Sequence, residues 1–373
     1  MSEPLRLAMI PGDGIGPEIM ATARSVLMAL FPPGTLEPAE AEAGWDTFRR
    51  TGTALPDTTV QLLETCDGAL FGAVSSPSGP VEGYRSPIVA LRRKLDLFAN
   101  LRPLVSAPVA TARPDVDILL VRENTEGLYI GDETCFDENL PSEHVVARRL
   151  ISRPACERIA EIACRAAAER RERGGPGRLT IAHKANVLRR SDGLFRGVCL
   201  QVAKGFPELE VEDQLVDSLL YRLIQEPQRY DVIVAPNLYG DLLADAGAAL
   251  VGGLGLVPSA NLGFRHGRPW VLAEPVHGSA PDIAGRGVAN PIAMLSATAL
   301  LLEHLERRDE ARRLRSAIRK TLIAGPRTPD LGGGASTADV LSAILDALGD
   351  SQEPVTSADG APLQPAMMGE EHD

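Results

Sequence analysis

Two aspartates, Asp241 and Asp245, stand four residues apart in the segment Asn-Leu-Tyr-Gly-Asp-Leu-Leu-Ala-Asp. On a helix this spacing puts both carboxylates on one face, with Cβ atoms about 5–6 Å apart. Two like charges at that distance repel unless a cation lies between them, and Mg²⁺ or Mn²⁺ takes oxygen ligands of this kind. Asp217 follows an apolar pair and is a candidate third ligand. The pattern predicts a metal site, although the spacing alone also fits a solvated helix face.

Three arginines, Arg92, Arg102 and Arg122, each stand at the edge of an apolar segment. A guanidinium binds a carboxylate through two parallel hydrogen bonds, a geometry that lysine does not offer. Three such groups beside a metal would suit a substrate with two or three carboxylates. Taken singly, each arginine is more often a surface residue.

Lys184 and Tyr129 are the candidate proton-transfer groups. Lys184 follows the apolar run 179–182. Beside a metal and arginines its pKa would be lowered by like charge, which would make it a base near neutral pH. Tyr129, in Thr-Glu-Gly-Leu-Tyr, has a phenol that could act as an acid. A packed ring with a hydrogen-bonded hydroxyl is the commoner outcome for tyrosine.

The glycine-containing segments point to a nucleotide. No GxGxxG fingerprint follows the first apolar run, and the GxGxG of residues 11–17 is weak support for a nucleotide loop. Segment 274–285 is more suggestive, because Gly278, Ser279 and Ala280 let a backbone approach a phosphate or a ring closely. Asp282 could accept hydrogen bonds from ribose hydroxyls and would repel a 2′-phosphate, which favours NAD over NADP.

The elements that must position these side chains alternate along the chain. Short apolar runs that favour buried strands lie at 5–10, 68–74, 118–121, 179–182 and 231–235. Helical patterns lie at 86–97 and 154–173, and another helix begins near Pro17, with proline and an acid in its first turn. This alternation predicts an α/β fold with much parallel sheet, in which ligands collect at the carboxyl ends of strands.

Composition excludes several classes of protein. The formal net charge of −12 argues against nucleic acid as a partner, because phosphate backbones need clustered lysine and arginine. No apolar run approaches the roughly 18–20 residues that a membrane span needs, and the first residues do not form a signal peptide. The five cysteines contain no CxxC pair, which fits reduced thiols. We therefore expect a cytoplasmic protein with no membrane partner.

Six segments together resemble the isocitrate and isopropylmalate dehydrogenase family of β-decarboxylating enzymes. They occur in the family's order at residues 11–18, 91–103, 121–129, 183–188, 237–245 and 274–285. The resemblance runs from about residue 5 to residue 347. The probability of a chance match to all six segments is negligible, so the bland interpretations given above for single residues no longer apply.

The resemblance implies a two-domain α/β fold with a large mixed or parallel sheet, distinct from the common Rossmann fold. The large domain, on the cofactor side, would comprise 1–102 and 257–350. The small domain would comprise 103–256 and carry a dimerisation arm around 132–150. Residues 351–373 are polar, with proline, glycine, serine and acids, and are expected to form a disordered tail.

The resemblance also implies a homodimer, or a tetramer of such dimers, with shared active sites. Lys184 and Asp217 would reach into the partner's cleft. The metal, Mg²⁺ or Mn²⁺, would be bound by Asp217, Asp241 and Asp245. NAD would be bound by His277, Gly278, Ser279, Ala280, Asp282 and Asn290. The hydroxy-polycarboxylate substrate would contact Arg85, Ser86, Arg92, Arg102, Arg122, Lys184 and Asp217.

In the implied reaction, Lys184 takes the proton of the C2 hydroxyl as hydride leaves C2 for the nicotinamide. The β-carboxylate, held by the arginines, departs as CO₂, and Tyr129 protonates C3. A regulatory subunit that keeps the fold and loses the site is the non-enzyme alternative. Every expected catalytic position is filled here, which favours the enzyme.

The substrate is indicated by the residues that precede Arg92. Isopropylmalate enzymes typically carry Glu seven residues before this arginine and Leu at four and three before, where this chain has Arg85, Ile88 and Val89. Isocitrate enzymes typically carry Ser six before, matched by Ser86, and Asn four before, which is absent. Segments 86–92 and 325–333 look most like homoisocitrate dehydrogenases of lysine biosynthesis. We expect conversion of homoisocitrate to 2-oxoadipate, with isocitrate, or 3-isopropylmalate of leucine biosynthesis, as alternative substrates.

Overall fold

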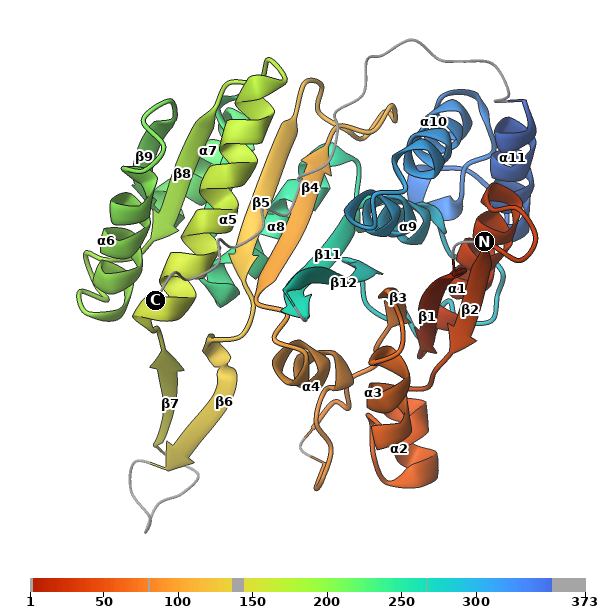
Figure 1. The fold of residues 1–373 in the computed structure, drawn as a ribbon, viewed down its shortest axis with the longest axis horizontal. Helices are drawn as coiled ribbons and strands as arrows, with labels where there is room; N and C mark the ends of the chain where they lie inside the picture. The colour runs from red at the N-terminus through yellow and green to blue at the C-terminus, as the bar shows by residue number, and fades with distance from the viewer. Residues whose placement is uncertain (1–2, 80, 136–143, 266, 351–373) are drawn as a thin grey trace. The chain divides into compact units, whose positions relative to one another are not determined.

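The structure is a computed structural model that describes residues 3–79, 81–135, 144–265 and 267–350. The fold is α/β and mostly parallel, as the alternation of runs predicted (Figure 1). The tail expected at 351–373 lies outside the described residues. Contacts divide the chain into two compact units. Unit 1 comprises Met1–Leu95, Val105–Pro114 and Ala248–Asp373, and unit 2 comprises Asp96–Leu104 and Asp115–Gly247.

These units depart from the expected domain boundaries at 102/103 and 256/257. Segment 96–102 belongs to unit 2, where the N–H of Asn124 donates to the carbonyl of Phe98 at 2.9 Å. Segments 105–114 and 248–256 belong to unit 1 and bond to each other. The N–H of Ala107 donates to Val251 at 3.1 Å, and that of Arg113 donates to Leu250 at 2.7 Å.

Unit 1 is built on five strands in the order β2-β1-β3-β12-β11. They are β1 (Leu5–Gly12), β2 (Leu36–Glu40), β3 (Gly68–Ala73), β11 (Pro258–Arg265) and β12 (Arg268–Pro275). All pairs are parallel except the β11–β12 pair. β1 and β3 are apolar and almost wholly buried, as strands covered on both faces are. The runs at 5–10 and 68–74 are thus confirmed as strands.

The helices of unit 1 are α1 (Gly16–Leu30), α2 (Trp45–Thr51), α3 (Asp57–Leu63), α4 (Pro87–Lys94), α9 (Ile292–His304), α10 (Arg308–Ala324) and α11 (Thr337–Gly349). Helices α1 and α9 lie against this sheet, and α10 and α11 pack on them (Figure 1). Helix α9 packs on β12, β11 and β3 and is buried on nearly every side. Helix α4 is shorter than the pattern at 86–97 predicted, because Asp96 adopts a left-handed φ of 45° that no helix continues through.

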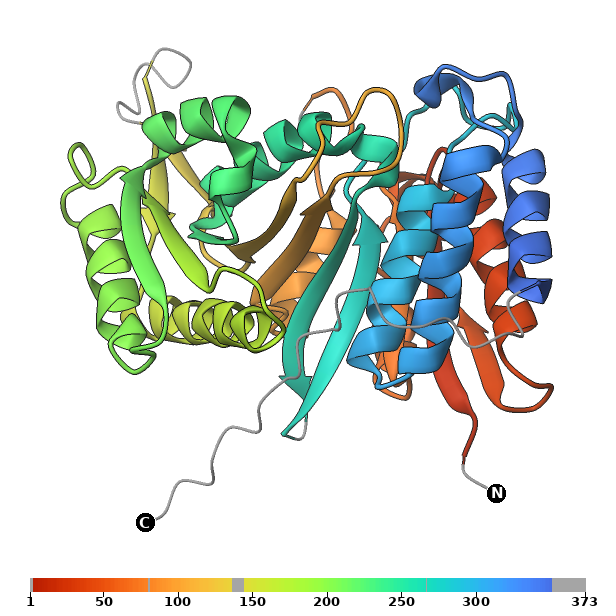
Figure 2. The same cartoon turned by 90° about the horizontal axis from the view of Figure 1, so that it is seen from above.

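Unit 2 has five sheet strands in the order β4-β5-β10-β8-β9. They are β4 (Ala99–Val105), β5 (Asp117–Glu123), β8 (Arg178–His183), β9 (Glu210–Leu215) and β10 (Val232–Ala235). The helices are α5 (Arg153–Glu172), α6 (Ser191–Ala203), α7 (Val216–Gln225) and α8 (Asn237–Val251). Helices α5 and α6 cover one face of the sheet, and α7 and α8 cover the other (Figure 2). The pairs among β5, β10, β8 and β9 are parallel, so their carboxyl ends meet at one edge.

The polar segment expected to form an arm contains a separate two-stranded antiparallel sheet. Its strands are β6 (Gly127–Cys135) and β7 (Val145–Leu150), and residues 136–143 between them lie outside the described residues. The ladder has an irregularity between Gly127 and Asp132. Val145 and Leu150 are 62% and 47% exposed, so apolar side chains of this sheet face away from the chain's own core.

Candidate active site

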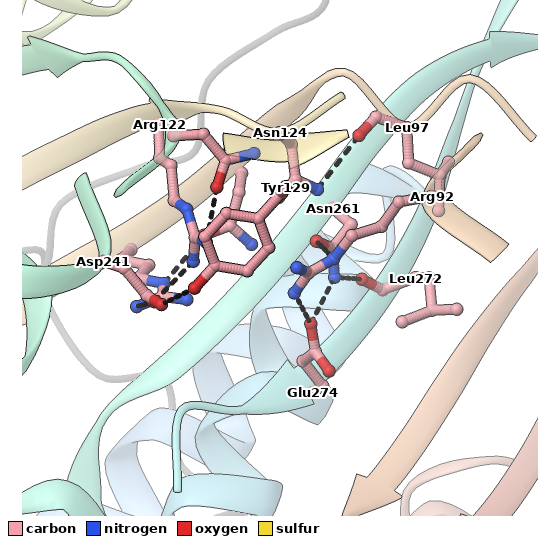
Figure 3. A network of polar contacts seen from close by, with 12 residues as sticks. Arg92, Leu97, Arg122, Asn124, Tyr129, Asp241, Asn261, Leu272 and Glu274 are labelled. Atoms are coloured by element: carbon pink, nitrogen blue, oxygen red, sulfur yellow. Dashed lines mark hydrogen bonds and ion pairs between the residues drawn. The ribbon is translucent and has the colours of Figure 1, made fainter. Parts of the chain in front are cut away.

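Asp241 receives three donors within unit 2. Its Oδ1 lies 2.5 Å from Nη1 of Arg122 and 3.0 Å from Nη1 of Arg102, and its Oδ2 accepts from the Tyr129 hydroxyl at 2.7 Å. Figure 3 shows Arg122 and Tyr129 directed at this carboxylate. Both arginines are almost wholly buried. The structure thus brings together four of the residues that the sequence singled out, from β4, β5, β6 and α8.

Local packing explains why Arg122 can lie at the carboxyl end of β5 with only 1% of its surface exposed. A Cβ at Gly240 would approach Cγ of Arg122 to 2.7 Å, so the helix passes the arginine only because glycine stands there. Nη2 of Arg122 also donates to Oδ1 of Asn237 at 2.8 Å. Nε of Arg102 donates to Oδ1 of Asn100 at 2.7 Å. Both guanidiniums are therefore fixed in orientation before any ligand binds.

The electrostatics of this cluster fit the expected roles. Burial raises the pKa of Tyr129, and the Asp241 carboxylate raises it further, so the phenol keeps its proton at neutral pH and remains a donor. Burial also raises the pKa of Asp245, with the charge of Asp241 as the next cause. The two carboxylates therefore repel each other on helix α8, as their spacing predicted.

The donor set of Asp241 and Asp245 fits a hard divalent cation, because it consists of carboxylate oxygens whose repulsion a cation would relieve. Asp217 is not brought to them within one chain. Among the described residues, no group of three or more His, Cys, Asp or Glu side chains is arranged to hold a metal ion. The three-ligand site stays a prediction that requires a second chain.

Lys184 and Asp217 instead contact each other. Nζ of Lys184 lies 2.6 Å from Oδ1 of Asp217, at the start of α7. This ion pair lowers the pKa of Asp217. Within one chain, the charged neighbour of Lys184 is thus a carboxylate, whereas the sequence had suggested a metal and arginines.

Arg92 lies in unit 1 with partners that sequence reasoning missed. Its Nε donates to Oδ1 of Asn261 at 3.1 Å, and its Nη2 lies 2.9 Å from Oε1 of Glu274 (Figure 3). Asn261 also donates to Glu274 at 2.7 Å. Glu274 begins a segment that was assigned to the cofactor, and no signal in the sequence ties it to Arg92.

Arg85 and Ser86 precede helix α4. Arg85 is exposed, and Ser86 occupies the N-cap position without a side-chain capping bond, so its hydroxyl is not engaged by the helix. Ile88 and Val89 are partly buried on the first turn. The preceding Tyr84 lies edge-on to Trp45 with ring centroids 5.1 Å apart, and this contact anchors the segment.

The candidate cofactor loop follows β12. Ser279 is buried, its carbonyl accepts from the N–H of Ile15 at 2.9 Å, and its hydroxyl bonds to that of Ser75 at 2.8 Å. A Cβ at Gly14 would lie 2.1 Å from the Ser279 carbonyl oxygen, so the glycine-containing loop 11–16 packs directly on this segment. Ala280 adopts a left-handed φ of 38°, which is uncommon outside glycine.

The other predicted cofactor residues differ in how well their surroundings suit a nucleotide. Nε2 of His277 is buried and has no hydrogen-bond partner among the described residues, and burial lowers the pKa of this imidazole. A neutral ring with an unused nitrogen suits a planar polar group such as adenine. Gly278 and Asp282 are exposed. Asn290 is buried and donates to Oδ2 of Asp330 at 2.9 Å, a partner that the sequence did not suggest.

Comparison with known proteins assigns the class. The family model described as isocitrate/isopropylmalate dehydrogenase matches residues 6–344. The chain therefore belongs to the isocitrate/isopropylmalate dehydrogenase family, whose members act on small hydroxy acids. It is a dehydrogenase of this class, and the resemblance inferred from six motifs is confirmed.

The names of individual relatives give different substrates. The chain is 47% identical over 343 residues to the isocitrate/homoisocitrate dehydrogenase of Thermus thermophilus, covering 92% of this chain and 98% of that protein. It is 45% identical over 347 residues to the 3-isopropylmalate dehydrogenase of Methanothermobacter thermautotrophicus, covering 93% and 99%. The crystal structure of isocitrate dehydrogenase from Methylococcus capsulatus superimposes with a TM-score of 0.86 at 38% identity, covering 92% and 99%.

Two further expectations concern membrane-spanning helices and the state of the cysteines. In the part of the chain that the structure describes, no helix is long and apolar enough to cross a membrane. Cys66, Cys156, Cys164 and Cys199 are buried free thiols, as expected for reduced cysteines. Burial raises the pKa of Cys156 and of Cys164 to about 12, so these thiols are unreactive in the folded chain.

Proposed function

We propose that this protein catalyses the NAD-dependent oxidative decarboxylation of a 2-hydroxy tricarboxylic acid, with homoisocitrate as the preferred substrate and 2-oxoadipate as the product. The observation that carries the proposal is the convergence of Arg102, Arg122 and Tyr129 on Asp241. Two buried, pre-oriented guanidiniums beside a protonated phenol suit a substrate that presents carboxylates and needs a proton donor. Arg92 adds a third guanidinium for the same class of ligand.

The chain's own residues perform the binding and the proton transfers. Arg102 and Arg122 hold the carboxylate that is lost as CO₂. Lys184 accepts the proton of the C2 hydroxyl, and Tyr129 donates a proton to C3 after CO₂ has left. The place of Tyr129 supports this last role, because its hydroxyl carries a proton at neutral pH and lies beside the two arginines on Asp241.

Two bound groups complete the reaction. When bound, NAD would supply the hydride acceptor, and Mg²⁺ or Mn²⁺ would supply the Lewis acid that lowers the pKa of the substrate hydroxyl. Asp241 and Asp245 would hold the metal together with Asp217. His277, Gly278, Ser279, Ala280, Asp282 and Asn290 would hold NAD. The exposed carboxylate of Asp282 favours NAD over NADP by at least about tenfold in kcat/KM, because a carboxylate facing a phosphate costs on the order of 1.4 kcal/mol.

We also propose a homodimer with shared active sites. Among the described residues of one chain, no group of three acids is arranged to hold a metal, which supports this arrangement, as do the exposed Val145 and Leu150 of the β6–β7 sheet. Mixing Lys184→Met chains with Tyr129→Phe chains is expected to restore part of the activity, since one of the two sites would then be intact. Verified subunit exchange without any recovery would contradict the shared site.

The substrate preference rests on Arg85 and Ser86. A carboxylate on the variable branch needs a cation or a hydroxyl donor, whereas an isopropyl branch needs apolar atoms, which Ile88 and Val89 supply. We expect kcat/KM to fall in the order homoisocitrate, isocitrate, isopropylmalate. Isocitrate ranks second because no asparagine stands at position 88.

A three-substrate panel with NAD and Mg²⁺ tests the proposal. Arg85→Val is expected to remove the advantage of the two tricarboxylates and to spare isopropylmalate. Arg93→Val, which removes an exposed arginine from the same segment, is the matched control and should leave the order unchanged. A preference of wild-type protein for isopropylmalate by about tenfold or more (about 1.4 kcal/mol) would refute the substrate assignment.

A further inference from the structure

The backbone of Lys184 is held on both sides at the carboxyl end of β8. Its N–H donates to Oδ2 of Asp192 at 2.5 Å. Its carbonyl accepts the N–H groups of Val187 and Leu188 at 3.0 and 2.9 Å. The origin of the side chain is therefore fixed, while 26% of the side chain remains exposed.

Asp192 is completely buried in the first turn of α6, where a helix N-terminus favours a negative charge. Its Oδ1 pairs with the guanidinium of Arg149 on strand β7. That guanidinium lies over the ring of Tyr239 on α8, 5.1 Å from its centroid. Burial raises the pKa of Tyr239, and the Asp192 carboxylate raises it further. The buried Asp192 carboxylate thus connects strand β7, the segment of Lys184 and helix α8, which carries Asp241.

We propose that Asp192 is a positioning residue that sets the place of Lys184 through its backbone and links that place to strand β7. The inference rests on the proposed function, in which Lys184 is the base. A buried carboxylate that served only to neutralise Arg149 could direct both oxygens at the guanidinium. Here one oxygen is given to the Lys184 amide instead. The position of a catalytic group matters because a displacement of about 1 Å can lower the rate about 100-fold.

The chain contains a matched control in Asp231. This carboxylate is also completely buried in unit 2 and pairs with an arginine, Arg170. It also accepts a backbone N–H, that of Arg178, at 3.1 Å. It lies at the opposite end of β8, away from Lys184. Substitutions at Asp192 and at Asp231 therefore both remove a partner of a guanidinium and an acceptor of a backbone N–H, and only those at Asp192 affect the segment that carries Lys184.

The test compares Asp192→Ala and Asp192→Asn with Asp231→Ala and Asp231→Asn, at a temperature where circular dichroism shows all four folded. We expect Asp192→Ala to lower kcat about 100-fold while KM for NAD changes less than about twofold. Asp192→Asn should recover part of this kcat, because its amide oxygen can still accept from Lys184. Both Asp231 variants should keep the wild-type kcat and lose thermal stability.

A second readout does not depend on turnover. The rate of reductive methylation of Lys184, measured by mass spectrometry relative to Lys204, should rise in Asp192→Ala as the contact with Asp217 loosens, and should not change in Asp231→Ala. If wild-type protein turns over none of the three substrates, the proposed function fails and methylation still decides the positioning role. An unchanged kcat in Asp192→Ala, an equal loss of kcat in Asp231→Ala, or an unchanged methylation rate would overturn the inference.

Discussion

The two ends of strand β8 are built alike, and only one of them carries a proposed catalytic residue. At its start, the N–H of Arg178 donates to buried Asp231, and at its carboxyl end the N–H of Lys184 donates to buried Asp192. Each aspartate has an arginine as its second partner. A buried ion pair is therefore no marker of function by itself. The two ends differ in the residue whose backbone the aspartate holds. The side chain of Arg178 pairs with Glu210 of the neighbouring strand, whereas the side chain of Lys184 reaches Asp217 on α7.

The largest expected difference between the two ends is in turnover. Lys184→Met should lower kcat by about 10²–10⁴-fold, because a positioned general base contributes that much. Arg178→Met, which removes the charge of a long cationic side chain at the other end of the same strand, should leave kcat unchanged. Steady-state kinetics with saturating NAD and Mg²⁺ measure both. Comparable loss of kcat in the two variants would remove the functional distinction between the ends.

The next effect is on stability at the Asp231 end. Asp231→Asn should lower the free energy of unfolding by about 3 kcal/mol, because it leaves Arg170 without its buried partner. Urea denaturation at neutral pH measures this change. The double variant Asp231→Leu with Arg170→Met should recover most of it, since neither charge is then present. If the double variant is as unstable as the single one, the loss comes from packing or from the Arg178 N–H that has lost its acceptor, and not from the unpaired charge.

Metal dependence should distinguish the carboxyl end of the sheet from its start. Chelation with EDTA should abolish turnover, and Mg²⁺ or Mn²⁺ should restore it. Asp241→Asn should raise the metal concentration for half-maximal activity at least about tenfold, or about 1.4 kcal/mol, because one anionic ligand is lost. Asp117→Asn, at the start of β5, is the control and should leave this concentration unchanged. Full activity of a chelated preparation would contradict the metal assignment.

The smallest expected effect is on stability at Asp213, the partner of His183 at the end of β8. Nε2 of His183 lies 2.9 Å from Oδ2 of Asp213, whose pKa is lowered, chiefly by its hydrogen bonds with Arg196. A carboxyl whose folded pKa is depressed contributes stability above its ordinary value of 3.8 and loses it as pH falls further. Asp213→Asn should therefore cost about 0.5 kcal/mol at pH 7, and the difference from wild type should shrink below pH 4. A cost that grows on acidification would contradict this direction.

The sequence was sufficient for the apolar strands β1, β3, β5, β8 and β10, and it singled out the residues that contact Asp241. The apolar runs before Arg122 and Lys184 are local signals, and the four-residue spacing of Asp241 and Asp245 carries its own geometry. Asp192 was not predicted because its role depends on where β7 and the Lys184 loop meet it, which local pattern does not encode. Asn261 and Glu274 were missed for the same reason, as they meet Arg92 across 169 and 182 residues of sequence.

The helix pattern at 86–97 was too long for a related reason. Leucine, arginine and lysine continue a helical pattern through residue 95. An aspartate at position 96 does not by itself indicate the left-handed backbone that ends the helix. The irregular, polar character of the arm likewise concealed the antiparallel pairing of β6 and β7. Such pairing depends on a partner strand, and this ladder has an irregular register.

The division of the chain between its two units sets an order of events during synthesis. Unit 2 ends within helix α8, whereas unit 1 is missing β11, β12, α9, α10 and α11 until the last part of the chain has been made. Domains fold as units as the chain emerges from the ribosome. Unit 2, which carries Lys184 and Asp241, can thus complete its sheet strands first, while β3 keeps an unpaired edge until β12 has been made. We therefore expect nascent chains to be open to misassociation through the edge of β3 until β12 has been made.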